Sequence, residues 1–157
     1  MEDGTYRDCS NCRMTPDCCS NFRNIDNPVI SELEIKEIQE KLGIDNFYER
    51  QDNGTYTVNT NEKGECIFYL NKGCSIYKYR PADCRLFPYD IVKKDEHYYL
   101  VLYKVCCIDQ ELFSSPSEIR RIDSVVQSVI PWIEDFTKEE NYEKMSYLPY
   151  KVLRRVK

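Results

Sequence analysis

The chain has 157 residues, of which 41% are hydrophobic and 31% charged, and its formal net charge is −5 at pH 7. This length fits one domain with its own core, and the composition argues against general disorder. The negative charge argues against nucleic-acid binding, and the longest apolar run, residues 98–103, is far below the roughly 20 residues of a membrane-spanning helix. The acidic N-terminus lacks the apolar segment of a secretory signal, so we expect a cytoplasmic protein without nucleic-acid or membrane partners.

A dense group of cysteines at residues 9–19 comes first along the chain, and a helix is predicted after it. Ser31 and Glu34 have the spacing of a capping box, and apolar residues then recur at helical intervals as far as Leu42. Gly43 is a typical helix stop, because glycine readily adopts the left-handed conformation found there.

Short elements are predicted in the segment that follows. Residues 46–50 are expected to form a helical turn, and residues 55–60 (TYTVNT) a strand, because β-branched and aromatic residues lie there between turn formers. Residues 66–70 (CIFYL) predict a second strand, and residues 71–73 a turn.

Two prolines delimit the next expected helix. Pro81 suits its start and Pro88 its end, which leaves room for one or two helical turns within residues 80–88. Residues 89–92 and 97–105 are then predicted to form a β-hairpin around a charged turn.

A longer helix is predicted in a helical C-terminal region of about residues 115–141. Ser115 and Glu118, with a proline between them, combine an N-cap, an N1 proline and a capping-box acid. An apolar stripe follows, and Pro131 should kink or end this helix before residues 132–136 resume it.

The last residues, 142–157, match no single element, and their basic side chains are expected to be solvated. These side chains are Lys151, Arg154, Arg155 and Lys157. The elements together predict a small α+β protein, a single domain over residues 1–157 with short antiparallel strands, flanking helices and irregular cysteine-bearing segments.

Nine cysteines are the most informative feature of the sequence. They lie in the segments 9–19, 66–88 and 106–107 and are Cys9, Cys12, Cys18, Cys19, Cys66, Cys74, Cys84, Cys106 and Cys107. Because no export signal is visible and the count is odd, metal ligation is favoured over a disulfide framework. Thiolates are soft ligands that suit zinc and iron–sulfur clusters.

The spacing of the cysteines bears on how many metal centres they could form. Cys9–Cys12 has the C-x2-C spacing that lets one turn direct two sulfurs at one metal, and two further sulfurs must come from elsewhere. In the adjacent pairs Cys18–Cys19 and Cys106–Cys107, neighbouring side chains of an extended backbone point to opposite faces. One member of a pair could therefore serve a second centre or pack as a small apolar group. Nine sulfurs suffice for two four-cysteine sites, and one site is the simpler interpretation.

Histidine contributes little to the pattern. His97, the only one, lies on a predicted strand far in sequence from the cysteines and is expected to be structural. A four-ligand site would then be mostly or wholly sulfur, which fits structural zinc or an iron–sulfur cluster better than a hydrolytic zinc site. Of the two cofactors, an iron–sulfur cluster such as 4Fe–4S is preferred.

The spacing Cys9-x2-Cys12-x5-Cys18-Cys19, the segment CIFYL and the block CSIYKYRPADCRLFP at residues 74–88 resemble the YkgJ-type cysteine-cluster family. That family is described as a "putative zinc- or iron-chelating domain", and some members are labelled flagellin N-methylase-like. The resemblance implies metal chelation by Cys9, Cys12, Cys18 or Cys19, Cys66, Cys74, Cys84 and one of Cys106 and Cys107. Five residues separate Cys12 from Cys18 where the family has two, so the ligand role of the first adjacent pair stays open.

Two arginines flank Cys84. A four-thiolate centre is doubly negative, and a nearby guanidinium would offset that charge and donate hydrogen bonds. We expect Arg80 to lie beside the centre, whereas Arg85 could equally form a surface ion pair with Asp83 or Asp90.

Three functions follow from these patterns. The first is a metal-binding protein whose centre is structural or transfers electrons. The second is an iron–sulfur-dependent protein-modifying enzyme resembling flagellin lysine N-methylase, and the third is a thiol–disulfide redox protein. The first is favoured, because the sequence has no G-x-G-x-x-G turn, no recognisable nucleophile–base pair, and no strand before Cys9–Cys12. Enzymatic activity, and any protein partner or substrate, stay open.

Overall fold

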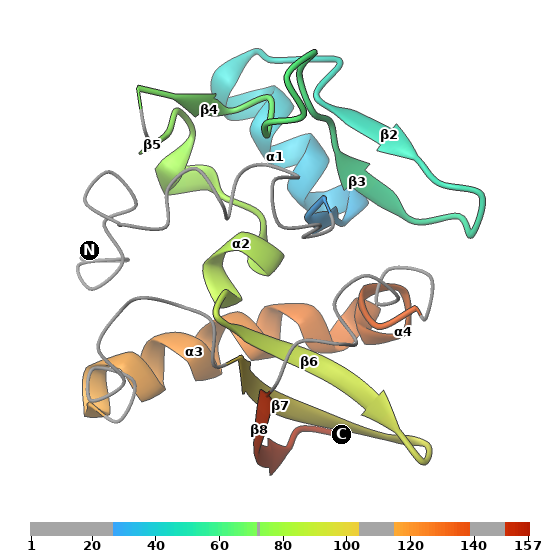
Figure 1. Cartoon of the computed structure of the whole chain (residues 1–157), viewed down its shortest axis with the longest axis vertical. Coiled ribbons are helices and arrows are strands. Elements are labelled where there is room, and N and C mark those ends of the chain that lie inside the picture. Colours follow the sequence, from blue (N-terminus) through green and yellow to red (C-terminus); the bar gives the residue numbers. More distant parts are fainter. Residues whose placement is uncertain (1–26, 72, 104–114, 139–149) are drawn as a thin grey trace.

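The computed structural model describes residues 27–71, 73–103, 115–138 and 150–157. Three small antiparallel sheets and several short helices make up these ranges, so the predicted α+β class is confirmed (Figure 1). None of the helices described is long and apolar enough to cross a membrane.

The first three-stranded sheet packs with helix α1. Strand β3 (Tyr56–Val58) lies between β1 (Val29–Ile30) and β2 (Tyr48–Arg50), within the strand predicted at residues 55–60. Helix α1 (Glu32–Leu42) contributes its buried isoleucines to the core of this part of the molecule.

Helix α1 begins and ends as predicted. Ser31 Oγ accepts a hydrogen bond from the Glu34 N–H at 3.2 Å, and the Glu34 carboxylate accepts from the Ser31 N–H at 2.9 Å. Gly43 has a φ of 64°, and its N–H donates to the Gln39 carbonyl at 2.9 Å. These short-range bonds satisfy the backbone groups that a helix leaves unpaired at its ends.

The helical turn predicted at residues 46–50 is wrong. Asn46 has a φ of 61°, which no right-handed helix allows, and strand β2 begins two residues later. Phe47 is fully buried, and the following residues pair with β3. Burial of this aromatic ring and strand pairing thus outweigh the local preference for a turn of helix.

The strand predicted at residues 66–70 is only partly present. Cys66 forms an isolated β-bridge with Thr60. The chain then turns, and the Tyr69 N–H donates a hydrogen bond to the Cys66 carbonyl at 2.9 Å. Strand β4 is therefore limited to Tyr69–Leu70, and it pairs with β5 (Gly73–Cys74) in a small hairpin.

A short helix connects the two parts of the molecule shown in Figure 1. After the 3-10 turn η3 (Tyr77–Tyr79), helix α2 (Ala82–Leu86) lies between two groups of elements. On one side are α1 and its sheet, and on the other are the sheet of β6 (Tyr89–Lys94), β7 (His97–Tyr103) and β8 (Tyr150–Arg155) and helix α3 (Pro116–Val129). Pro81 is its N-cap, and it ends before Pro88, which confirms the helical turns predicted within residues 80–88.

The predicted hairpin is confirmed as β6 (Tyr89–Lys94) and β7 (His97–Tyr103). Its two-residue turn has positive φ at both Asp95 (50°) and Glu96 (66°), the combination that a type I′ hairpin turn requires. The end of the predicted second strand, residues 104–105, lies outside the described residues.

A third strand joins this hairpin from the C-terminal tail, which the sequence left unassigned. Strand β8 (Tyr150–Arg155) pairs antiparallel with β7, and its residues are exposed. The four basic side chains expected to be solvated are exposed, and Arg154 forms an ion pair with Asp123.

The C-terminal helix is confirmed as α3 (Pro116–Val129), with the Ser115 Oγ accepting from the Glu118 N–H at 3.2 Å. At Pro131 the chain passes through a 3-10 turn, η5 (Ile130–Trp132), into α4 (Ile133–Phe136). The break is expected, because proline cannot donate the backbone hydrogen bond of a helix interior. Residues 139–141 of the predicted region lie outside the description.

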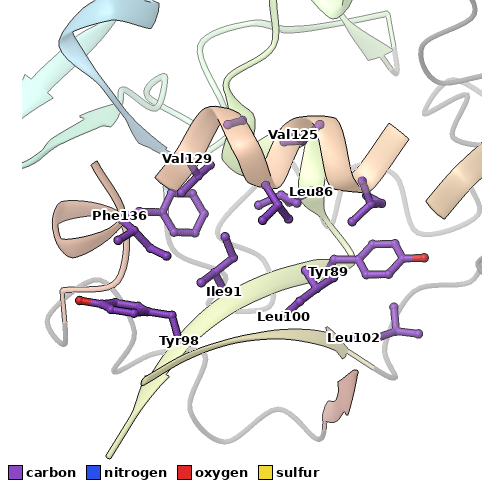
Figure 2. Close-up of a cluster of buried hydrophobic side chains, with 13 residues drawn as sticks. Leu86, Tyr89, Ile91, Tyr98, Leu100, Leu102, Val125, Val129 and Phe136 are labelled. Atoms are coloured by element: carbon purple, nitrogen blue, oxygen red, sulfur yellow. The ribbon is translucent and has the colours of Figure 1, made fainter. Parts of the chain in front are cut away.

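Two apolar clusters form the core. We call the first the C-terminal cluster, and Figure 2 shows side chains of α3 and α4 meeting those of β6 and β7 within it. It comprises Ala82, Leu86, Tyr89, Ile91, Tyr98, Leu100, Leu102, Ile122, Val125, Val126, Val129, Ile133 and Phe136. We call the second the N-terminal cluster, which comprises Ile30, Ile35, Ile38, Phe47, Val58, Phe68 and Ile76. Both buried apolar residues of α2 belong to the C-terminal cluster.

Candidate metal centre

Three of the nine cysteines lie in the described part of the chain. Cys66, Cys74 and Cys84 are each half-buried. The other six candidate ligands fall outside the described residues and remain predictions; they are Cys9, Cys12, Cys18, Cys19, Cys106 and Cys107.

Cys66 and Cys74 belong to one compact unit of backbone. Cys74 lies on β5 directly opposite Tyr69 of β4, and the Tyr69 N–H bonds back to the Cys66 carbonyl. Both cysteine side chains pack against the N-terminal cluster. The β4–β5 hairpin therefore anchors two candidate ligands to one side of the molecule.

The Cys66 thiol is largely buried, and two backbone N–H groups lie beside it. Burial raises its pKa, and the backbone N–H groups of Phe68 and Tyr69 oppose that rise by hydrogen bonding. Burial is the larger effect and disfavours the unpaired charge, whereas the two amides favour the ionised sulfur. A bound cation would lower the cost of burying that charge.

The third cysteine, Cys84, is carried by α2. The N-terminus of this helix is held by the Glu34 carboxylate, which accepts from the Ala82 N–H at 2.6 Å. Asp83 reaches back to β1 and accepts from the Val29 N–H at 2.8 Å. A five-residue helix is not stable by itself, so these tertiary contacts decide where its cysteine lies.

The two arginines beside Cys84 have different surroundings. Arg80 is only 6% exposed, its Nε donates to the Tyr77 carbonyl at 2.9 Å, and its guanidinium carbon lies 3.6 Å from the centre of the Tyr77 ring. It is thus a buried cation held in one orientation. Arg85 is half-buried near the end of α2. His97 is half-buried opposite Lys94 on the β6–β7 hairpin, apart from the cysteine-bearing elements.

The described residues do not form a complete metal centre. Across the described ranges, no group of three or more His, Cys, Asp or Glu side chains could hold a metal ion. Cys66, Cys74 and Cys84 therefore do not converge into a three-sulfur site on their own. Their donor chemistry nevertheless fits zinc or iron–sulfur, because soft cysteine sulfurs prefer these metals to magnesium or calcium.

The sequence patterns missed the residues that hold α2 in place. Glu34 was recognised as a cap of α1, and its second bond, to the Ala82 N–H, joins residues 48 apart in sequence. Arg121 of α3 donates from Nη1 to the Arg85 carbonyl at 3.0 Å, over a separation of 36 residues. Caps are recognisable because their partners lie a few residues apart, and no comparable local pattern marks these longer contacts.

Comparison with known proteins gives one match. The family model "CxxCxxCC: Putative zinc- or iron-chelating domain" matches residues 8–107. This range contains all nine cysteines and ends before helix α3. No curated protein and no solved structure matches the chain.

Proposed function

This chain belongs to the CxxCxxCC family, described as a "putative zinc- or iron-chelating domain", and on that premise we propose that its cysteines hold an iron–sulfur cluster or a zinc ion. The observation that carries the proposal is the family match over residues 8–107, which takes in every cysteine of the chain. Such a centre would stabilise the fold and, if it is an iron–sulfur cluster, could also transfer electrons.

The β4–β5 hairpin and α2 supply the described ligands of this proposed centre. Cys66 and Cys74 come from the hairpin, and Cys84 from the helix. Because these three residues form no three-ligand site within the described ranges, the further ligands of a four-sulfur centre would come from residues 9–19 and 106–107. The centre would then join segments that are distant in sequence, which is how a metal contributes to folding.

Arg80 is proposed to offset the negative charge of the centre. A four-thiolate site around zinc or a 4Fe–4S cluster keeps a net negative charge, and a buried guanidinium lowers the cost of placing that charge inside the protein. The buried position of Arg80 and its fixed orientation on the Tyr77 ring support this role.

Nine cysteines kept as thiols or thiolates also need a reducing compartment, so we place the protein in the cytoplasm.

The test is elemental analysis of the full chain, purified without oxygen, together with its absorption spectrum. Iron with acid-labile sulfide and a brown colour would identify a cluster. A colourless zinc protein would retain the structural role and remove electron transfer. A chain that contains neither metal, and takes up neither on reconstitution, would overturn the proposal.

The described ligands can be tested one at a time. Cys74→Ser and Cys84→Ser should each lose most of the bound metal and part of the circular dichroism signal, because metal binding is coupled to folding. The exposed neighbour Ser75→Ala is the matched control and should keep both. Unchanged metal content in both cysteine variants would exclude Cys74 and Cys84 as ligands.

A further inference from the structure

Helix α3 lies beyond the residues that match the family, yet it holds the helix that carries Cys84. Arg121 on α3 donates from Nη1 to the carbonyl of Arg85, one residue after Cys84, at 3.0 Å. This carbonyl is near the C-terminus of α2, where helix carbonyl groups have no partner within the helix and where positive charge is favourable.

The Arg121 guanidinium is itself fixed by a buried carboxylate. Its Nε and Nη2 donate to the two carboxylate oxygens of Glu118, each at 3.0 Å, and the Glu118 side chain is 0% exposed. A bidentate pair of this kind specifies both the position and the orientation of the guanidinium. The remaining nitrogen is thereby directed at α2.

The two ends of α2 are thus held by opposite charges from different helices. The Glu34 carboxylate of α1 receives the first N–H of α2, and the Arg121 guanidinium of α3 binds a carbonyl near its end. Both charges have the sign that the helix dipole favours. Because α2 has only five residues, a shift at either end would move Cys84.

We propose that Glu118 and Arg121 are positioning residues for Cys84, so that the metal-binding unit extends beyond residue 107 into α3. This inference rests on the proposed function and assigns that site a support that the family match does not cover. The pair acts through the backbone of α2 and touches no metal.

The experiment compares variants of the full, metal-loaded chain by the rate at which each loses its own metal to excess EDTA. Arg121→Met removes the bond to α2, and Arg121→Lys keeps the charge without the two-point fit to Glu118. We expect release about tenfold faster for Arg121→Met, with an intermediate rate for Arg121→Lys, by analogy with the loss of other groups that orient metal ligands. Exchange of the α2 amides in the loaded protein should accelerate in the same order.

Two controls separate positioning from a general loss of stability. Arg120→Met changes the exposed neighbouring arginine and should release metal at the wild-type rate. Ile133→Val truncates a buried side chain of the C-terminal cluster, on α4. This variant should lower stability without accelerating metal release. If Arg121→Met released metal at the wild-type rate, or if Ile133→Val accelerated release as much as Arg121→Met does, the inference would be overturned while the proposed function would stand. A wild-type chain that binds no metal would overturn the proposed function together with it.

Discussion

At the scale of single residues, one buried side-chain hydrogen bond links the two strands of the β6–β7 hairpin. Tyr103 Oη donates to Asp90 Oδ2 at 2.9 Å, and the other carboxylate oxygen accepts from the Ile91 N–H at 2.7 Å. Burial and, next, the negative charge of Asp90 raise the pKa of Tyr103 far above its usual value. The folded state therefore strongly favours the protonated phenol.

Substitution of Tyr103 should lower stability in a pH-dependent way. Tyr103→Phe removes the bond to Asp90 and should lower the free energy of unfolding at pH 7 by about 1–2 kcal/mol. Because the folded pKa is raised, this contribution is complete below the unfolded value of about 10 and declines as the pH rises above it. The difference between wild type and variant, measured by urea unfolding, should therefore shrink above pH ~10.

Tyr99→Phe is the control for this measurement, since Tyr99 is half-buried on the same strand. Its stability difference from wild type should be smaller at pH 7. A Tyr103→Phe variant as stable as wild type at pH 7 would contradict the importance of the buried bond.

At the scale of elements, the junction of α1 and α2 depends on one carboxylate. Glu34 accepts bonds from the Ser31 N–H, at the start of α1, and from the Ala82 N–H, at the start of α2. The sequence reveals the first bond through the capping-box spacing and contains no comparable pattern for the second. One side chain thus makes both a short-range cap within α1 and a long-range bond to α2.

Loss of that carboxylate should affect both helices. Glu34→Ala should lower the free energy of unfolding by about 2 kcal/mol, because it removes a cap and a second backbone bond. Amide exchange measured by NMR should accelerate at Ala82. Glu37→Ala, an exposed site on the same helix, should change stability by less than about 0.5 kcal/mol. Undiminished protection of the Ala82 amide would show that α2 is held without Glu34.

At the scale of the whole molecule, α2 connects the two apolar clusters. Its Ala82 and Leu86 pack in the C-terminal cluster, and Asp83 bonds to the backbone of β1 beside the N-terminal cluster. Cys66 and Cys74 pack against the N-terminal cluster. The single tryptophan, Trp132, packs against the C-terminal cluster, so its fluorescence can follow the unfolding of that cluster.

Metal removal should therefore be detected by Trp132. The urea midpoint followed by tryptophan fluorescence should fall when the metal is removed, because a ligand that binds the folded state stabilises all elements that unfold with its site. Leu86→Ala, at a fully buried position, should cost about 3 kcal/mol and make that shift smaller by loosening α2 from the C-terminal cluster. The same fluorescence midpoint with and without metal in the wild-type chain would show that the clusters unfold independently.

The sequence by itself determined the features whose causes are local. The capping box at Ser31, the helix stop at Gly43 and the break at Pro131 involve partners within a few residues, and the structure has all three. The cysteine spacing, together with the block at residues 74–88, was likewise enough to indicate the family that the comparison shows, because these features can be read directly from the sequence.

Only the tertiary structure decided how these elements combine. The burial of Phe47 turned an expected helical segment into strand β2, and the exposed strand β8 exists through its pairing with β7. The bonds that place Cys84 join α2 to α1, β1 and α3 across 36 to 54 residues of sequence. Contacts over such distances depend on how apolar surfaces pack, and packing leaves no pattern at fixed spacing for a sequence to reveal.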